Sequence, residues 1–150
     1  VKQINDLRSE YSDLNKLIFD PPFEKNNLPD TKGIYLLELE LSAARYIEAG
    51  KRGSILFKKG IYIYVGSAYG PGGLRGRLGH HLRPAPKPHW HIDYLKQHAP
   101  VKNITVFEVH KEYEHEMALK LSKEFDVPLP GFGSSGCGCP AHLFYRVKEN

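Results

Sequence analysis

The fold is decided by one stretch of sequence, Gly33-Ile34-Tyr35-Leu36-Leu37-Glu38-Leu39-Glu40-Leu41. Its leucines alternate with glutamates from Leu37 onward, and this period of two predicts a strand with one buried face. A second stretch, Ile61-Tyr62-Ile63-Tyr64-Val65-Gly66, is dense in β-branched and aromatic residues and sets its aliphatic side chains opposite Tyr62 and Tyr64. We therefore expect two strands of one sheet.

Outside these strands, the chain alternates helical and extended patterns. Apolar spacings of three and four predict helices over about 1–19, 74–82, 89–98 and 112–125, and a third main strand is expected over 101–109. Glycines within 42–60 predict a hairpin inserted between the first two strands. Residues 128–140 are expected to form a Gly-rich loop, followed by a short apolar end over 143–147. This order predicts an α+β fold: a small antiparallel sheet of mixed order, with three main strands plus the inserted hairpin, flanked by helices.

The length of 150 residues suits a single hydrophobic core. We divide the chain into a helix and linker over 1–31 and a compact domain over 32–150. The apolar stripe of the first helix would either cap the sheet or contact a partner protein or a second copy of the chain. No stretch approaches the roughly 18 apolar residues that span a membrane, and residues 1–31 lack a signal-peptide layout. We expect no membrane partner and a cytoplasmic location.

Positive charge is concentrated in one part of the chain. Residues 49–92 contain eight Lys and Arg and no Asp or Glu, whereas the remainder has 13 basic and 17 acidic residues. Such an asymmetry favours a surface that meets phosphate, against the alternative of a solvated basic loop. The basic surface is expected to contact nucleic acid through Arg75, Arg83, Lys87, His89 and His91.

Several short motifs occur in a definite order along these elements. Gly33-Ile34-Tyr35 lies in one predicted strand and Tyr64-Val65-Gly66 in the next, followed by Arg77 and His81 one helical turn apart and by a glutamate on a later helix. Together they resemble the GIY-YIG nuclease family over about residues 32–147. Within that family the sequence looks closest to a small subgroup, marked here by the segments 64–68, 89–93 and 137–144.

The resemblance implies a DNA endonuclease that hydrolyses phosphodiester bonds with Mg²⁺ or Mn²⁺, selecting DNA structure or, weakly, sequence. Branched and single-stranded DNA are among the expected substrates. The alternatives are a nucleic-acid-binding module that keeps the fold without efficient cleavage, and a metal-stabilised partner-interaction domain. The resemblance also implies that Tyr35 and Tyr64 lie near the attacking water.

The chemistry of these residue types suits that reaction. Arg77 has a guanidinium that stays charged and can bind two phosphate oxygens, and His81, four residues later, shares its helix face. A free phenol titrates near pH 10, so a tyrosine that activates water needs a cation nearby, and Arg77 could provide it. The competing interpretation is that both tyrosines are half-buried residues bonding across the sheet.

The metal ligand is expected to be a carboxylate, because Mg²⁺ prefers oxygen and commonly takes one or two protein ligands. We favour Glu114, which extends the buried stripe of the predicted helix toward the sheet, over Glu116. The competing interpretation for both is a solvated carboxylate in the first turn of a helix.

A zinc site is a further hypothesis. Cys137, Cys139 and His142 could bind zinc with His115 as the fourth ligand, whereas the narrow cysteine spacing favours small buried residues in a tight loop. Ser134, Ser135 or His142 could take the place of the late Asn common in the family, and Gly136 stands where the subgroup usually has Asp. In the 89–93 segment, His89 and Asp93 have the i, i+4 spacing of a pair.

Overall fold

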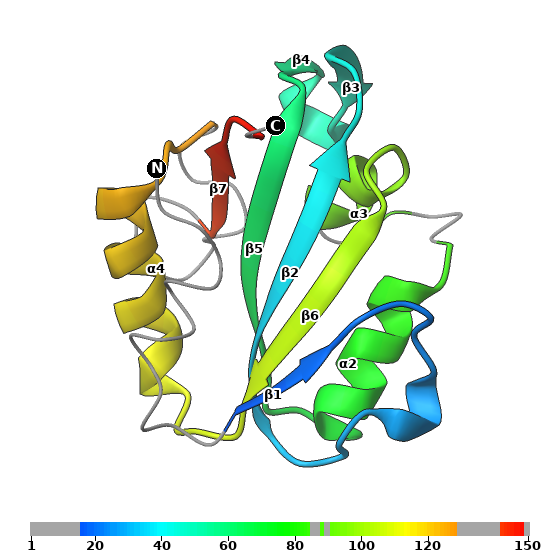
Figure 1. The fold of residues 1–150 in the computed structure, drawn as a ribbon, viewed down its shortest axis with the longest axis vertical. Coiled ribbons are helices and arrows are strands. Elements are labelled where there is room, and N and C mark those ends of the chain that lie inside the picture. Colours follow the sequence, from blue (N-terminus) through cyan, green and yellow to red (C-terminus); the bar gives the residue numbers. More distant parts are fainter. Residues whose placement is uncertain (1–15, 85–87, 89–90, 129–141, 149–150) are drawn as a thin grey trace.

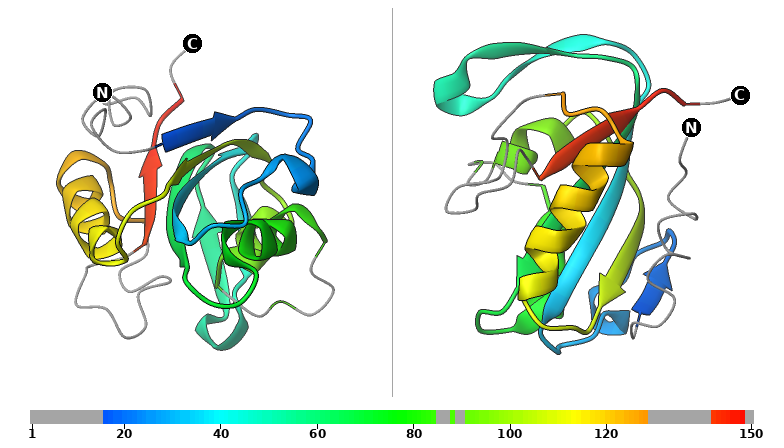
Figure 2. Two further views of the ribbon diagram at one scale, coloured as in Figure 1. Left: turned by 90° about the horizontal axis from the view of Figure 1, so that it is seen from below. Right: turned by 90° about the vertical axis from the view of Figure 1, so that its left-hand side faces the viewer.

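The computed structural model describes residues 16–84, 88, 91–128 and 142–148, and of His91 the backbone alone. Its centre is an antiparallel sheet in the order β1-β6-β2-β5-β7, with α4 on one face and α2 and α3 on the other (Figure 1, Figure 2). The sheet strands are β1 (Lys16–Phe19), β2 (Gly33–Leu41), β5 (Gly60–Ala68), β6 (Val101–Phe107) and β7 (Leu143–Arg146). The helices are α2 (Gly73–Leu82), α3 (His91–Lys96) and α4 (Glu112–Glu124), with short 3-10 turns at η1 (Lys25–Asn27) and η2 (Gly50–Arg52). The chain is therefore an α+β protein, as its sequence predicts.

β2 is the central strand and is buried along almost its whole length, including Glu38 at 8% exposure. It pairs with β5 on one side and β6 on the other, and its register sets Tyr35 opposite Gly66. The Glu38 carboxylate has polar partners there. Asn103 donates a hydrogen bond to it, and Arg146 Nη2 lies 3.8 Å from its Oε1. The prediction that these two stretches are strands of one sheet is confirmed, and the two strands are neighbours.

Two apolar cores lie on opposite faces of the sheet. On the α4 face, Ile34, Val65 and Phe107 pack against Met117 and Leu121. On the other face, the alternating residues of β2 and β5 pack against α2 and α3 through Tyr35, Leu37, Leu39, Tyr62, Tyr64, Leu74, Leu78, Ile92 and Leu95. The tyrosines of the two motif strands therefore face α2.

The inserted hairpin is confirmed as β3 (Arg45–Glu48) and β4 (Ser54–Phe57), which form a separate two-stranded sheet at one end of the molecule. Its inner face joins the core through Ile47 and Phe57, whereas Tyr46 and Leu56, opposite each other in the register, are 69% and 52% exposed. The helices predicted over 74–82 and 112–125 and the strand over 101–109 are also confirmed, with ends within two residues of those expected.

The prediction of one helix over 1–19 is wrong at its end, because residues 16–19 form β1 and pair with β6. Residues 1–15 lie outside the described residues. The apolar spacing of this segment fits a helix, but β6 otherwise presents an unpaired edge, and pairing with β1 satisfies its backbone. β1 thus joins the sheet of the domain that we expected to begin at residue 32.

The C-terminal segment 143–147 is also more than the short apolar end expected. It supplies β7, whose backbone pairs with β5 from Ile61 to Tyr64, so the sheet has five strands where three were expected. A strand of four residues is too short for its period to be recognised without its partner.

In the part of the chain that the structure describes, no helix combines the length and apolar character needed to cross a membrane.

Candidate active site

The start of α2 is held tightly against the segment that leads into β2. Gly72 and Gly73 have φ values of +86° and +59°, and a Cβ at Gly73 would collide with the carbonyl oxygens of Asp30 and Thr31. The Leu74 N–H donates to the Thr31 carbonyl at 2.8 Å. The glycines of this loop therefore fix the helix beside the N-terminal end of β2, because only glycine tolerates both the conformation and the close approach.

From this position α2 directs His81 at the sheet. Tyr35 Oη lies 2.8 Å from His81 Nε2, and both residues are buried at 1% and 4% exposure. The Tyr64 ring lies 6.4 Å from the Tyr35 ring and 6.1 Å from the His81 ring, measured between centroids. Three predicted site residues from β2, β5 and α2 thus form one cluster.

The two motif glycines lie at close contacts, and Gly66 makes room for this cluster. Gly66 stands opposite Tyr35, and a Cβ there would collide with the ring and hydroxyl of Tyr35. A Cβ at Gly33 would collide with the carbonyl oxygen of Phe107 on β6. The glycine of each motif is required by close packing at the end of the sheet where the tyrosines and α2 meet.

Arg77 is half-buried on α2 and reaches the same cluster. Its charge and a hydrogen bond lower the pKa of Tyr35, but burial acts more strongly and raises that pKa well above its usual value. Burial, and next the charge of Glu114, raise the pKa of Tyr64 as well. Both phenols are therefore protonated at neutral pH, and Arg77 offsets only part of the effect of burial.

Arg77 also lines a hollow of about 210 Å³ at the start of α2, together with His80 and the glycines of the loop. The hollow joins the C-terminal end of β5, through Ala68, to the exposed surface. A guanidinium at such a place can bind the oxygens of an anion that enters from solvent.

Burial lowers the pKa of His81 to about 3, and the charge of Lys96 adds to this shift. The ring is therefore neutral at neutral pH. The described neighbours of the His81 ring include Tyr35, whose hydroxyl lies beside Nε2, and Lys96. Lys96 Nζ lies 3.4 Å from His81 Nδ1. His80, the neighbouring residue, turns instead toward Asp93, with Nε2 at 3.2 Å from Oδ1.

Glu114 lies half-buried in the first turn of α4, with Oε2 3.8 Å from His142 Nδ1. Glu116 and His115 are exposed. The charge of Glu114 raises the pKa of both Tyr64 and Tyr35, so it acts on the same cluster from the other helix. A partly exposed carboxylate suits Mg²⁺ or Mn²⁺, with water and phosphate as the remaining ligands.

His142, one of the predicted zinc ligands, lies against β5. It is buried at 5% exposure, and its Nδ1 donates to the Val65 carbonyl at 3.2 Å, while the Val65 N–H donates to the His142 carbonyl. Burial lowers its pKa, and Glu114 opposes that effect. Cys137, Cys139 and Gly136 lie outside the described residues, as do Ser134 and Ser135. The described residues contain no group of three or more potential metal ligands.

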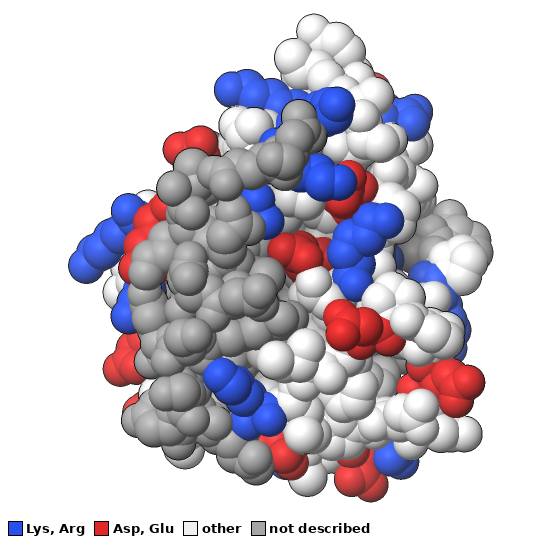
Figure 3. All heavy atoms as spheres, viewed as in Figure 1, with Lys and Arg blue, Asp and Glu red and all other residues white. Residues whose placement is uncertain are grey.

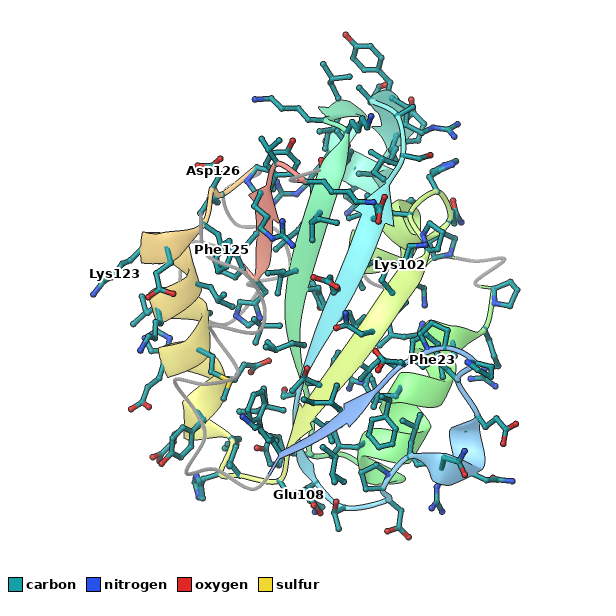
Figure 4. All side chains as sticks on the ribbon, in the orientation of Figure 1. Phe23, Lys102, Glu108, Lys123, Phe125 and Asp126 are labelled. Atoms are coloured by element: carbon teal, nitrogen blue, oxygen red, sulfur yellow. The ribbon has the colours of Figure 1, made fainter. Side chains whose placement is uncertain are left out.

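Two of the predicted nucleic-acid contacts, Arg75 and Arg83, have described side chains. Arg75 has a local role, because its Nε donates to the Leu28 carbonyl at 2.9 Å and Asp30 lies 3.9 Å away. Arg83 is exposed beside a cavity of about 610 Å³ that Phe23 and Lys96 also line, and Figure 4 shows Phe23 next to α2. Lys87, His89 and the side chain of His91 lie outside the described residues.

Sequence reasoning missed the pair behind His81. Asp93 is fully buried, and Lys96 Nζ lies 3.1 Å from its Oδ1, with the Lys96 side chain 6% exposed. The i, i+4 spacing allows His89 as a partner of Asp93, but His89 lies outside the described residues. The described partners of Asp93 are Lys96 and His80. The i, i+3 spacing of Asp93 and Lys96 on a helix was the available signal.

Comparison with known proteins gives one result. The model of the family described as "Domain of unknown function DUF123" matches residues 34–150. The matched range includes β5, α2, α3, α4 and all of β2 after Gly33. No curated protein and no solved structure matches the chain significantly. Because the match covers most of its length, this chain belongs to the DUF123 family.

Proposed function

We propose that this protein is a DNA endonuclease that hydrolyses phosphodiester bonds with a divalent metal ion. The observation that carries the proposal is the cluster of Tyr35, Tyr64, His81 and Arg77, contributed by β2, β5 and α2. Membership in DUF123 supports it, because that family is GIY-YIG-like and nuclease-related.

Each group has a definite task in this reaction. The scissile phosphate binds Arg77 at the hollow beside α2, where the guanidinium neutralises charge that grows on the phosphate oxygens. The protonated hydroxyls of Tyr35 and Tyr64 donate hydrogen bonds that orient the phosphate and the attacking water. A bond forms between the water oxygen and phosphorus while the ester P–O bond breaks. The water proton passes to solvent, and the departing oxygen takes a proton from solvent.

Glu114 is the residue that would hold Mg²⁺ or Mn²⁺. The bound ion would neutralise phosphate charge and assist the departing oxygen. Glu114 is suited to this task because it is partly exposed and its charge acts on the two tyrosines.

The test is incubation with labelled linear, flapped, branched and single-stranded DNA in Mg²⁺, Mn²⁺ or EDTA. We expect cleavage that requires metal and that falls by about 10²–10³-fold in Arg77→Ala, since charge stabilisation in the transition state has that magnitude. Lys123→Ala is the matched control, because Lys123 is exposed near the far end of α4 (Figure 4). Undiminished cleavage by Arg77→Ala would contradict the proposal.

A second candidate is a nucleic-acid-binding module that does not cleave. It is favoured by the raised pKa values of both tyrosines, which leave neither phenol as a base at neutral pH, and by the eight cations of residues 49–92. Such a module would bind every substrate in EDTA with salt-dependent affinity and cleave none in Mg²⁺ or Mn²⁺.

A further inference from the structure

A buried ion pair lies directly behind the tyrosine and histidine cluster. Asp93 and Lys96, both on α3, have side chains 0% and 6% exposed, and Lys96 Nζ is 3.1 Å from Asp93 Oδ1. Buried charges of this kind are costly unless they are paired and hydrogen-bonded. Asp93 meets that condition by also accepting from His80 Nε2 at 3.2 Å.

Lys96 reaches three acceptors. Besides Asp93, its Nζ lies 3.2 Å from the His80 carbonyl oxygen and 3.4 Å from His81 Nδ1. An ammonium group has three protons and no lone pair, so it can only donate. Donation to all three acceptors uses each proton once and requires that His81 Nδ1 carry a lone pair.

A lone pair on Nδ1 determines the protonation of Nε2, the other ring nitrogen. A neutral imidazole with an unprotonated Nδ1 has its proton on Nε2, the atom that lies 2.8 Å from Tyr35 Oη. His81 therefore donates and Tyr35 accepts. The neutral state agrees with the burial of His81, which lowers its pKa to about 3.

We infer that Asp93 and Lys96 are positioning residues that hold His81 as the Nε2–H tautomer, so that the Tyr35 oxygen accepts its hydrogen bond. The Tyr35 proton is then directed away from His81 and is available to the phosphate or water. The catalytic part of this inference rests on the proposed nuclease function. The tautomer of His81 does not depend on that function.

The order of dependence follows from the contacts. Asp93 orients Lys96 and, by its charge and hydrogen bond, raises the pKa of Lys96 against the lowering effect of burial. Lys96 then sets the tautomer of His81, and His81 sets the orientation of the Tyr35 hydroxyl. Neither member of the pair contacts Tyr35 in the described hydrogen bonds, so both act through His81.

The first test measures the tautomer in the absence of DNA and metal. Nitrogen NMR of the full chain labelled at its histidine side chains distinguishes a protonated from an unprotonated ring nitrogen. We expect His81 to show a protonated Nε2 and an unprotonated Nδ1 at neutral pH. A protonated Nδ1 would overturn the inference, whatever the protein does to DNA.

The second test removes the pair. Lys96→Met alone would leave Asp93 with one partner fewer in the interior, so the double variant Asp93→Asn, Lys96→Met is made beside it to remove both charges. In the double variant, with folding verified by thermal unfolding, we expect the Nε2–H tautomer to lose its dominance. Lys102→Met, an exposed lysine on β6 labelled in Figure 4, is the control and should retain the tautomer.

The third test connects the tautomer to cleavage. We expect the double variant to cleave at least about ten-fold more slowly, the size of effect typical of outer-shell partners. Added to Tyr35→Phe, the same changes should cost little more, because the pair acts through that hydroxyl. Fully additive losses would overturn the positioning role. Absence of cleavage in the wild type would contradict the proposed function and leave the NMR result as the measure of the inference.

Discussion

At the scale of single residues, the site depends on glycines as much as on reactive side chains. Gly66 stands opposite Tyr35 and provides the space in which its ring lies. The sequence shows this glycine only as the end of a strand motif. Glycine is needed at position 66 because of a contact across the sheet, and no local pattern reveals that contact.

Gly66→Ala should lower the free energy of unfolding by about 1–3 kcal/mol, because the added methyl group meets the Tyr35 ring and forces it to move. Urea unfolding measures the change. Gly70→Ala is the control, since a Cβ at Gly70 meets no atom within 4 Å and its stability should be nearly unchanged. Equal stability of the two variants would show that the Tyr35 ring is not confined as described.

His81 should make stability depend on pH. Its pKa is lowered by burial to about 3 in the folded protein, against about 6.5 in an unfolded chain, so between these values the unfolded state binds more protons. The free energy of unfolding should therefore fall as pH drops from about 6.5 toward 3, by up to about 1.4 kcal/mol per pH unit from this group. Urea unfolding at a series of pH values tests this prediction. The slope should be smaller in His81→Gln and unchanged in His110→Gln, which alters an exposed histidine.

At the scale of elements, α2 and α4 lie on opposite faces of the sheet. α2 brings His81 to Tyr35, and the charge of Glu114 on α4 raises the pKa of both tyrosines. Helical spacing correctly predicts both helices and the inward stripe of α4 that contains Met117 and Leu121. β1 and β7 were missed because each has only four residues, and their pairing partners β6 and β5 lie far away in sequence. Short edge strands are determined by the neighbour that needs pairing rather than by their own period.

Glu114→Gln should abolish metal-dependent cleavage while the chain stays folded, because it removes the carboxylate charge and keeps the size of the side chain. Cleavage assays in a Mg²⁺ titration, with circular dichroism as the folding control, measure this. Glu112→Gln, an exposed change in the same turn of α4, should retain full activity. Full activity in Glu114→Gln would instead move the metal assignment to Glu116.

At the scale of the whole molecule, charge is distributed unevenly over the surface. The face in Figure 3 mixes Lys and Arg with Asp and Glu across the sheet, and Lys and Arg side chains gather over the end where the hairpin projects. The exposed cations at that end include Lys51, Lys58 and Lys59. They belong to the basic block of residues 49–92, and we expect phosphate contacts at this hairpin end.

Binding of DNA should weaken as salt rises, and the hairpin should account for part of that dependence. The double variant Lys58→Gln, Lys59→Gln should reduce the slope of log K against log salt by about 2 if each lysine contacts one phosphate. Fluorescence anisotropy in EDTA measures binding without cleavage. The matched double variant Lys111→Gln, Lys123→Gln removes two exposed lysines on or beside α4 and should leave the slope unchanged. An unchanged slope in the hairpin variant would place DNA elsewhere.

The sequence by itself determined the two motif strands, the inserted hairpin, the helices that carry Arg77, His81 and Glu114, and the α+β class. Local periodicity and turn residues indicate each of these features. Only the tertiary structure decided which side chains meet. The Tyr35–His81 hydrogen bond joins residues 46 positions apart, and the contacts from Lys96 and Asp93 to the histidines of α2 cross between two helices. The protonation of these groups follows from their burial together, a property of the packed molecule rather than of any segment.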